Sequence, residues 1–177
     1  AGDAVVGWKI AATSTAGQRH INVDGPLCGR IYASRLLAPG ARVAMGDNIM
    51  KVAEAEFAFR FGRDLPPRGT DYSRDEALAA VDALLLSIEV PDSRYQDFTK
   101  VGAAQLIADT ACASWLVLGP AVDVPWQHID LSAHAVTGLR NEAKVAEGTG
   151  KAVLGDPRKA LAWFVNEAST YCGGVKA

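Results

Sequence analysis

The alternation of apolar and polar residues along the chain predicts several short strands. Residues 52–59 read VAEAEFAF, in which Glu54 and Glu56 alternate with apolar side chains. This is the two-residue period of a β-strand, and it places the two glutamates side by side on one face. Two like charges at this spacing repel each other. They therefore indicate either an exposed face screened by water or a cation held between them.

Further strands are expected at 4–13 and 115–119, from the same kind of pattern. The alternating residues 129–136 and the segment 139–148 predict a strand followed by the turn and return of a hairpin. The apolar run LLLSIEV, residues 84–90, predicts a buried strand that stops at Pro91.

Three helices are expected. Ser73 and Glu76 form a capping-box pattern that predicts a helix continuing to residue 84. A second helix is expected over 103–114, and a third begins where Asp156 caps and Pro157 occupies the first turn. Residues 15–50 are predicted to be rich in loops. Together these patterns predict a single α+β domain over residues 1–177, with a mixed or antiparallel sheet.

The composition excludes several classes of protein. Hydrophobic residues make up 49% of the 177 residues and charged residues 21%, values typical of a soluble globular domain. The net charge of −2, without a basic block, argues against a nucleic-acid or anionic membrane partner. No apolar run is long enough to span a membrane. Three widely spaced cysteines, Cys28, Cys112 and Cys172, favour reduced thiols and a cytoplasmic location.

A third carboxylate changes the interpretation of the first two. Glu89 is the only charge in the strand LLLSIEV, so it needs water, a basic partner such as Arg94, or a metal cation. Glu54, Glu56 and Glu89 together offer the oxygen ligands that a hard divalent cation prefers. With three protein ligands, the remaining coordination positions suit water and substrate, as in an Mg²⁺ enzyme. Solvated strand glutamates remain the alternative.

Five motifs occur in one order along the chain: GWKIAATS, EAEFAF, SIEVPDSR, IADTACAS followed by LVLG, and GDPRKALAWFVNE. In this order and spacing, the chain resembles the 2-keto-4-pentenoate hydratase group of the fumarylacetoacetate hydrolase superfamily, which also includes oxalocrotonate decarboxylases. The resemblance implies a mixed β-roll with flanking helices, and assembly as a homo-oligomer. It also implies that both ends of the family domain are missing, so that these residues are the central part of a longer protein.

The resemblance further implies the roles of single residues. It assigns Glu54, Glu56 and Glu89 as ligands of Mg²⁺ or Mn²⁺. It places Lys9 in the active site as a catalytic residue. The residues expected beside the substrate are Ser14, Asp109 and Cys112.

The chemistry implied is that of a lyase of aromatic-compound catabolism. A small 2-oxo acid would chelate the metal, which stabilises an enolate as a Lewis acid while water adds to a 2-hydroxypenta-2,4-dienoate-like substrate. Lys9 would carry a proton or face the developing negative charge. Burial of Lys9 is expected to lower its pKa.

Other classes stay open. Decarboxylation of a related dicarboxylate is a lyase alternative. Hydrolysis of a C–C bond in an acylpyruvate is another, although His20 lacks a neighbouring glutamate. A non-catalytic relative is the third, because Leu27 stands where hydratases of this group carry an acid.

Overall fold

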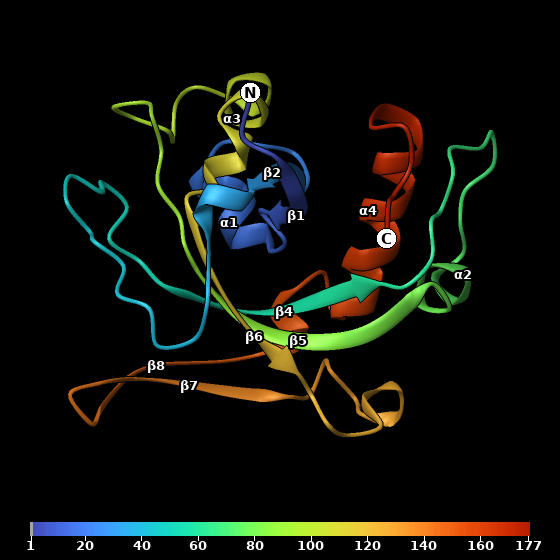
Figure 1. The fold of residues 1–177 in the computed structure, drawn as a ribbon. Helices are drawn as coiled ribbons and strands as arrows, with labels where there is room; N and C mark the ends of the chain where they lie inside the picture. Colours follow the sequence, from blue (N-terminus) through green and yellow to red (C-terminus); the bar gives the residue numbers. More distant parts are fainter. Residues whose placement is uncertain (1) are drawn as a thin grey trace. The chain divides into compact units, whose positions relative to one another are not determined.

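The computed structural model describes residues 2–177. The described residues divide into two compact units, one made of residues 2–58 and 85–120 and the other of residues 59–84 and 121–177. The long strands β4 (Glu54–Phe61) and β5 (Val81–Val90) each contribute to both units. They lie in a four-stranded sheet with β3 (Leu36–Leu37) and β6 (Trp115–Ala121), in the order β3-β6-β5-β4. Figure 1 shows β4, β5 and β6 of this sheet. The prediction of one catalytic domain over 1–177 stays a prediction.

The first unit begins with a two-stranded antiparallel sheet. Strand β1 (Val5–Ala11) pairs with β2 (Leu27–Tyr32), and Lys9 lies opposite Gly29. A short helix, α1 (Thr15–His20), connects the two strands. Helix α1 and strand β2 fall in the segment 15–50 that was predicted to be rich in loops, so that prediction was wrong for these residues. Their apolar residues are too few and too interrupted by glycine to show a clear period.

The remaining elements of this unit build its sheet and its core. A single 3₁₀ turn, η1 (Ala33–Arg35), leads into β3 (Leu36–Leu37), which pairs in parallel with β6 (Trp115–Ala121). Helix α3 (Ala103–Ala108) and the turn η2 (Thr110–Cys112) pack on β2. The buried cluster here is formed by Leu27, Leu106, Ala111 and Cys112.

The second unit has two helices packed on each other. Helix α2 (Arg74–Leu78) contacts α4 (Pro157–Tyr171). The predicted capping box is present, because Ser73 Oγ accepts a hydrogen bond from Glu76 N and the Glu76 side chain accepts one from Ser73 N. The helix is, however, shorter than predicted. Residues up to 84 were expected to be helical, whereas β5 begins at Val81.

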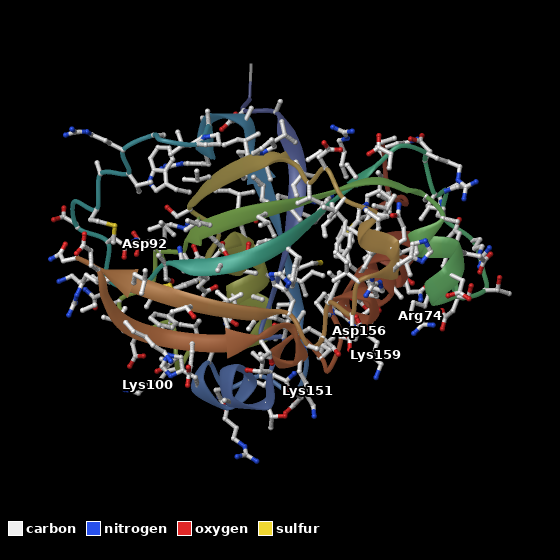
Figure 2. The ribbon with its side chains drawn as sticks, turned by 90° about the horizontal axis from the view of Figure 1, so that it is seen from below. Arg74, Asp92, Lys100, Lys151, Asp156 and Lys159 are labelled. Carbon is white, nitrogen blue, oxygen red and sulfur yellow. The ribbon has the colours of Figure 1, made fainter. Side chains whose placement is uncertain are left out.

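Helix α4 agrees with its sequence signals. Asp156 accepts a hydrogen bond from Arg158 N at 2.9 Å, and Figure 2 shows Asp156 and Lys159 together at the start of this helix. One face is buried through Ala160, Leu161, Phe164, Val165 and Ala168, the spacing of an amphipathic helix. The helix ends at Tyr171, and Gly173 and Gly174 follow with positive φ.

A β-hairpin completes the second unit. Strands β7 (Ala135–Arg140) and β8 (Ala143–Thr149) pair with each other, as predicted for the hairpin return. The first strand starts later than expected, at Ala135, because residues 131–133 form a turn. Two more 3₁₀ turns, η3 (Trp126–His128) and η4 (Gly150–Ala152), flank the hairpin. Within residues 2–177, no helix has the length and apolar character required to cross a membrane.

Candidate metal centre and active site

The three predicted glutamates converge. Glu54 and Glu56 come from the start of β4 and Glu89 from the end of β5, and each offers a carboxylate oxygen that lies within 4.8 Å of the other two. Glu54 is exposed, Glu56 is partly buried, and Glu89 is only 2% exposed. The site therefore has a buried inner side at β5 and an open side at β4, where a ligand could enter.

Mutual repulsion and burial change how readily these carboxyl groups ionise. The pKa of Glu56 is raised to about 8, first by burial and then by the negative charge of Glu89. Burial also raises the pKa of Glu89, although the charge of Lys9 opposes this effect. A divalent cation would remove both penalties, because it supplies the positive charge that the cluster lacks.

Lys9 supplies a positive charge beside this cluster. Its side chain is buried, with Nζ 2.9 Å from Glu89 Oε2, and it donates a hydrogen bond of 3.1 Å to the carbonyl oxygen of Ala111. Burial on its own lowers the pKa of Lys9, but the charges of Glu89, Glu56 and Glu54 outweigh it and the pKa is raised. The expected lowering is therefore wrong for the metal-free protein, because that expectation considered burial without the carboxylates.

Glu89 retains ligand capacity despite this ion pair. Its Oε2 atom is buried and has no hydrogen bond of acceptable geometry, even though Lys9 Nζ is within ion-pair distance. A buried carboxylate oxygen left in this state is costly unless a further partner is present. Two more carboxylates on the same side complete an oxygen donor set of the kind that Mg²⁺ and Mn²⁺ prefer. The residues present thus fit a hard divalent cation, and ligation by them stays a prediction.

The carbonyl partner of Lys9 belongs to an unusual turn. Thr110, Ala111 and Cys112 all have positive φ, of 53°, 52° and 63°, a conformation that costs free energy for residues with a side chain. Gly29 makes room for this turn, since a Cβ atom there would lie 1.8 Å from the Thr110 carbonyl oxygen. The helix predicted over 103–114 accordingly ends at Ala108.

Asp109 and Arg94 hold this turn in place. The Asp109 carboxylate accepts hydrogen bonds from Ser93 Oγ at 2.7 Å and from Arg94 N at 3.2 Å, and it forms an ion pair with the Arg94 guanidinium. Arg94 also donates to the carbonyl oxygen of Ala113 at 2.9 Å and to Thr110 Oγ1 at 2.8 Å. The alternative in which Arg94 pairs with Glu89 is therefore not realised. The SIEVPDSR motif already contained Ser93 and Arg94, but their partner lies fifteen or more residues away.

The other predicted substrate contacts lie on the same unit in different settings. Ser14 caps α1, where its Oγ accepts a hydrogen bond of 3.0 Å from Gly17 N. Cys112 is buried, and burial raises the pKa of its thiol, which keeps it uncharged at neutral pH. Asp109 is occupied as described above. Contact of these residues with a substrate stays a prediction, as does the catalytic role of Lys9.

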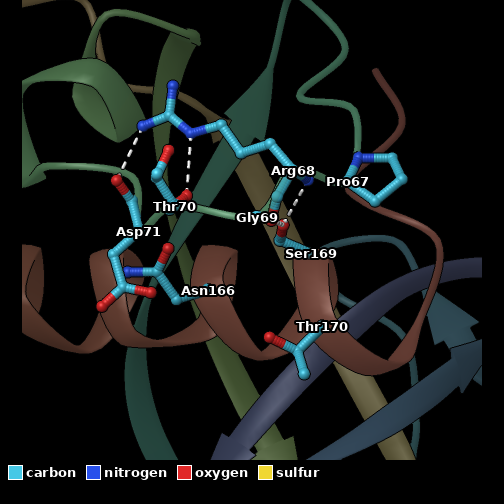
Figure 3. Close-up of a pocket in the computed structure, with 8 residues that line it drawn as sticks. All are labelled: Pro67, Arg68, Gly69, Thr70, Asp71, Asn166, Ser169 and Thr170. Carbon is cyan, nitrogen blue, oxygen red and sulfur yellow. Dashed lines mark hydrogen bonds between the residues drawn. The ribbon is translucent and has the colours of Figure 1, made fainter.

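One cavity lies beside this cluster and another lies away from it. A small one of about 20 Å³ is lined by Lys9, Glu89, Arg35 and Trp115 among others, which is room for roughly one water molecule. A larger one of about 490 Å³ lies between residues 67–71 and α4 (Figure 3). None of the predicted site residues lines this larger cavity.

The larger cavity is bordered by a loop that Arg68 stabilises from within. Its guanidinium donates to the carbonyl oxygens of Thr70 and Asp71 at 3.0 and 2.7 Å, and to Glu76 at 2.7 Å. Its backbone N–H donates to Ser169 Oγ at 3.0 Å, as Figure 3 shows. The hydrogen bonds of Arg68 thus hold this loop in its conformation.

Comparison with known proteins agrees with the fold. The family model described as fumarylacetoacetate (FAA) hydrolase C-terminal matches residues 13–174. The chain belongs to this family, and its mixed α+β fold is that of the family.

Individual relatives are similar over most of this chain. A protein named 2-keto-4-pentenoate hydratase 2 from Dechloromonas aromatica (strain RCB) is 35% identical over 172 residues, which is 97% of this chain and 64% of the relative. The 2-hydroxypent-2,4-dienoate hydratase of Pseudomonas putida is 32% identical over 94% of this chain and 73% of its own length. The chain thus spans less than two thirds of the first relative.

A solved structure is similar as well. It is 4-oxalocrotonate decarboxylase from Pseudomonas putida G7, complexed with magnesium and adipate. It superimposes with a TM-score of 0.82 at 25% sequence identity, covering 99% of this chain and 65% of that one.

Proposed function

We propose that the protein containing this chain is a metal-dependent lyase that hydrates a 2-hydroxypenta-2,4-dienoate-like substrate. The observation that carries the proposal is the convergence of Glu54, Glu56 and Glu89 beside the buried ammonium of Lys9. The hydratase relatives support the substrate class. The reaction adds the elements of water across a carbon–carbon double bond, giving a 4-hydroxy-2-oxo acid.

The cation proposed for this centre is Mg²⁺ or Mn²⁺. Glu54, Glu56 and Glu89 would hold it through carboxylate oxygens. When bound, a divalent cation supplies a Lewis acid that polarises the 2-oxo group. The magnesium in the decarboxylase structure supports the choice of a hard divalent ion.

The residues of this chain would orient the substrate and handle a proton. Lys9 lies beside the three carboxylates, with Nζ 2.9 Å from Glu89 Oε2, so as an ammonium it would serve as a proton donor and as a positive charge facing a developing oxyanion. One of its N–H donors is used by the carbonyl oxygen of Ala111, and its charge is paired with Glu89, so donor capacity remains for the substrate. The buried carbonyl contact fixes the amine against rotation.

The assembly, partner and location follow from the same proposal. We infer a small 2-oxo acid as the substrate partner, a homo-oligomeric assembly and a cytoplasmic enzyme of aromatic catabolism. The relatives named as hydratases of such acids support the catabolic role.

The test uses the full-length protein with Mg²⁺ or Mn²⁺ and 2-hydroxypenta-2,4-dienoate. Loss of the ultraviolet absorbance of the conjugated dienol, with formation of a 4-hydroxy-2-oxo acid detected by mass spectrometry, is the expected result. The variant Glu56→Gln should be inactive, while retaining a cooperative unfolding transition. Absence of turnover with saturating metal would reject hydration.

Decarboxylation is the second candidate, because the superimposed structure is a decarboxylase with a bound dicarboxylate. The same assay with an oxalocrotonate-type dicarboxylate separates the two reactions. Release of CO₂ with no water addition assigns the decarboxylase, and addition of water without CO₂ assigns the hydratase.

A further inference from the structure

Two buried polar side-chain atoms lack a hydrogen-bond partner, and they lie on the same strand. Among residues 2–177, the buried side-chain N and O atoms without a partner are Ser87 Oγ and Glu89 Oε2. Both belong to β5 and are two positions apart. Side chains two positions apart on a strand point to the same face.

The burial pattern confirms which face this is. Ser87 and Glu89 are 5% and 2% exposed, whereas Leu86 and Ile88 are each 49% exposed. The end of β5 therefore directs its polar residues inward and its apolar residues outward, the reverse of the usual arrangement. A seryl hydroxyl in such a position loses its hydrogen bonds to water without gaining one within the protein.

The Glu89 oxygen has a function that explains its state, since it is one of three carboxylates assigned to a cation. Ser87 has no such explanation in the metal-free chain. An alanine at position 87 would fill the same place in the strand without an unsatisfied hydroxyl. The unpartnered hydroxyl, on the same face of the strand as Glu89, therefore points to an acceptor supplied by a ligand of the site.

We propose that Ser87 is a ligand-binding residue of this site, donating a hydrogen bond to an oxygen atom of the molecule bound beside Glu54, Glu56 and Glu89. The inference rests on the proposed metal centre and adds a residue to it. The acceptor is either a water oxygen or a carboxylate oxygen of a 2-oxo acid. Positions two apart on a strand are separated by about 6.6 Å, so one small ligand with several oxygens can contact Ser87 while it lies beside Glu89.

The experiment compares Ser87→Ala with a matched control, Ser169→Ala, in the full-length protein. Ser169 is also buried, at 8% exposure, but its hydroxyl is satisfied by the backbone of Arg68. In the metal-free state, the melting temperature of Ser87→Ala should equal or exceed that of the wild type, because no hydrogen bond is lost. Ser169→Ala should melt at a lower temperature.

Binding is then measured by calorimetric titration with Mn²⁺ alone and with oxalate in the presence of saturating Mn²⁺. We expect Ser87→Ala to weaken either the affinity for Mn²⁺ or the affinity for oxalate about tenfold, which corresponds to the loss of one hydrogen bond. Ser169→Ala should leave both affinities unchanged. Weaker binding of Mn²⁺ alone identifies a water oxygen as the acceptor. Weaker binding of oxalate only identifies a carboxylate oxygen.

Three outcomes would overturn the proposal. Unchanged affinities for both Mn²⁺ and oxalate in Ser87→Ala refute the contact and leave the metal centre intact. A drop in melting temperature as large as that of Ser169→Ala shows that the hydroxyl already has a structural partner. If the wild-type protein binds no Mn²⁺, the metal centre itself fails and the Ser87 contact fails with it.

Discussion

Lys9 and Glu89 form a buried ion pair, in which Lys9 Nζ lies 2.9 Å from Glu89 Oε2 and the side chains are 6% and 3% exposed. The pair joins β1 to β5, and it sets one positive charge against three carboxylates. A buried ion pair stabilises the fold little more than apolar residues of equal size would, but removing one partner strongly destabilises it, because the other charge is left buried and unpaired. This asymmetry defines what substitutions in the site should do.

Lys9→Met should destabilise the metal-free protein by about 3–5 kcal/mol, because Glu89 is left buried without a counter-charge. Saturating Mn²⁺ should recover a large part of that loss. Urea unfolding with and without Mn²⁺ measures both effects. Lys100→Met is the control (Figure 2), since its ion pair with Asp97 is 81% and 45% exposed, and an exposed pair of this kind contributes little to stability. A loss in Lys9→Met that Mn²⁺ leaves unchanged would contradict the prediction.

Glu56→Gln should abolish Mn²⁺ binding and, at pH 7, stabilise the metal-free protein. The substitution removes a carboxyl group whose pKa is raised from 4.5 to about 8 by burial and by Glu89. At pH 7 this group must take up a proton on folding, a cost that glutamine does not carry. Calorimetric titration and thermal unfolding report the two effects. Glu142→Gln, at the exposed turn of the β7–β8 hairpin, should leave both unchanged. Retention of wild-type Mn²⁺ affinity in Glu56→Gln would exclude this residue as a ligand.

The stability of the metal-free protein should depend on pH through Glu56. Its pKa is raised from 4.5 to about 8 in the folded state, so the folded chain holds this proton more tightly than the unfolded chain. The free energy of unfolding that protonated Glu56 contributes is therefore fully present below about pH 4.5, and it is lost as the pH rises towards 8. Lys9 is protonated in both states over this range and does not oppose the effect. Mn²⁺ affinity should rise over the same interval, because ligation requires deprotonated carboxylates.

Urea midpoints measured at intervals between pH 5 and pH 8 test this dependence. The wild-type midpoint should fall with pH more steeply than that of Glu56→Gln, which lacks the titrating group. Parallel pH profiles for the two proteins would show that Glu56 does not titrate in this interval.

Arg94→Ala should cost about 2–3 kcal/mol, because it leaves the buried Asp109 carboxylate without its cation and releases the turn at Thr110–Cys112. That turn supplies the carbonyl oxygen which fixes Lys9, so turnover should fall as well. Urea unfolding and the hydratase assay measure these changes. Arg74→Ala is the control, since its ion pair with Asp75 is exposed. Equal stability of the two variants would rule out a structural role for Arg94.

Gly29→Ala should prevent stable folding of the first unit, because the new Cβ atom would lie 1.8 Å from the Thr110 carbonyl oxygen. Gly25→Ala is the matched control, with no heavy atom within 4 Å of its added Cβ. Circular dichroism and soluble yield distinguish the two. A Gly29→Ala protein that unfolds at the wild-type temperature would show that the turn can move aside.

Local signals in the sequence were sufficient for several elements. The capping box at Ser73, the Asp156–Pro157 start of α4 and the alternation around Glu54 and Glu56 depend on contacts within a few residues, and all three are present. The length of α2 was overestimated because residues 81–84 fit a helical pattern as well as a strand pattern. Pairing in the sheet decided between them.

The sequence by itself determined the family, the carboxylate strand and the residue types of the site. Only the tertiary structure decided the partners: Lys9 with Glu89 and Ala111, and Arg94 with Asp109. It also reversed the expected direction of the Lys9 pKa and revealed the orphan hydroxyl of Ser87. The physical reason is that periodicity and capping are local, whereas a pKa or an unsatisfied atom depends on charges and burial contributed by segments far apart in the chain.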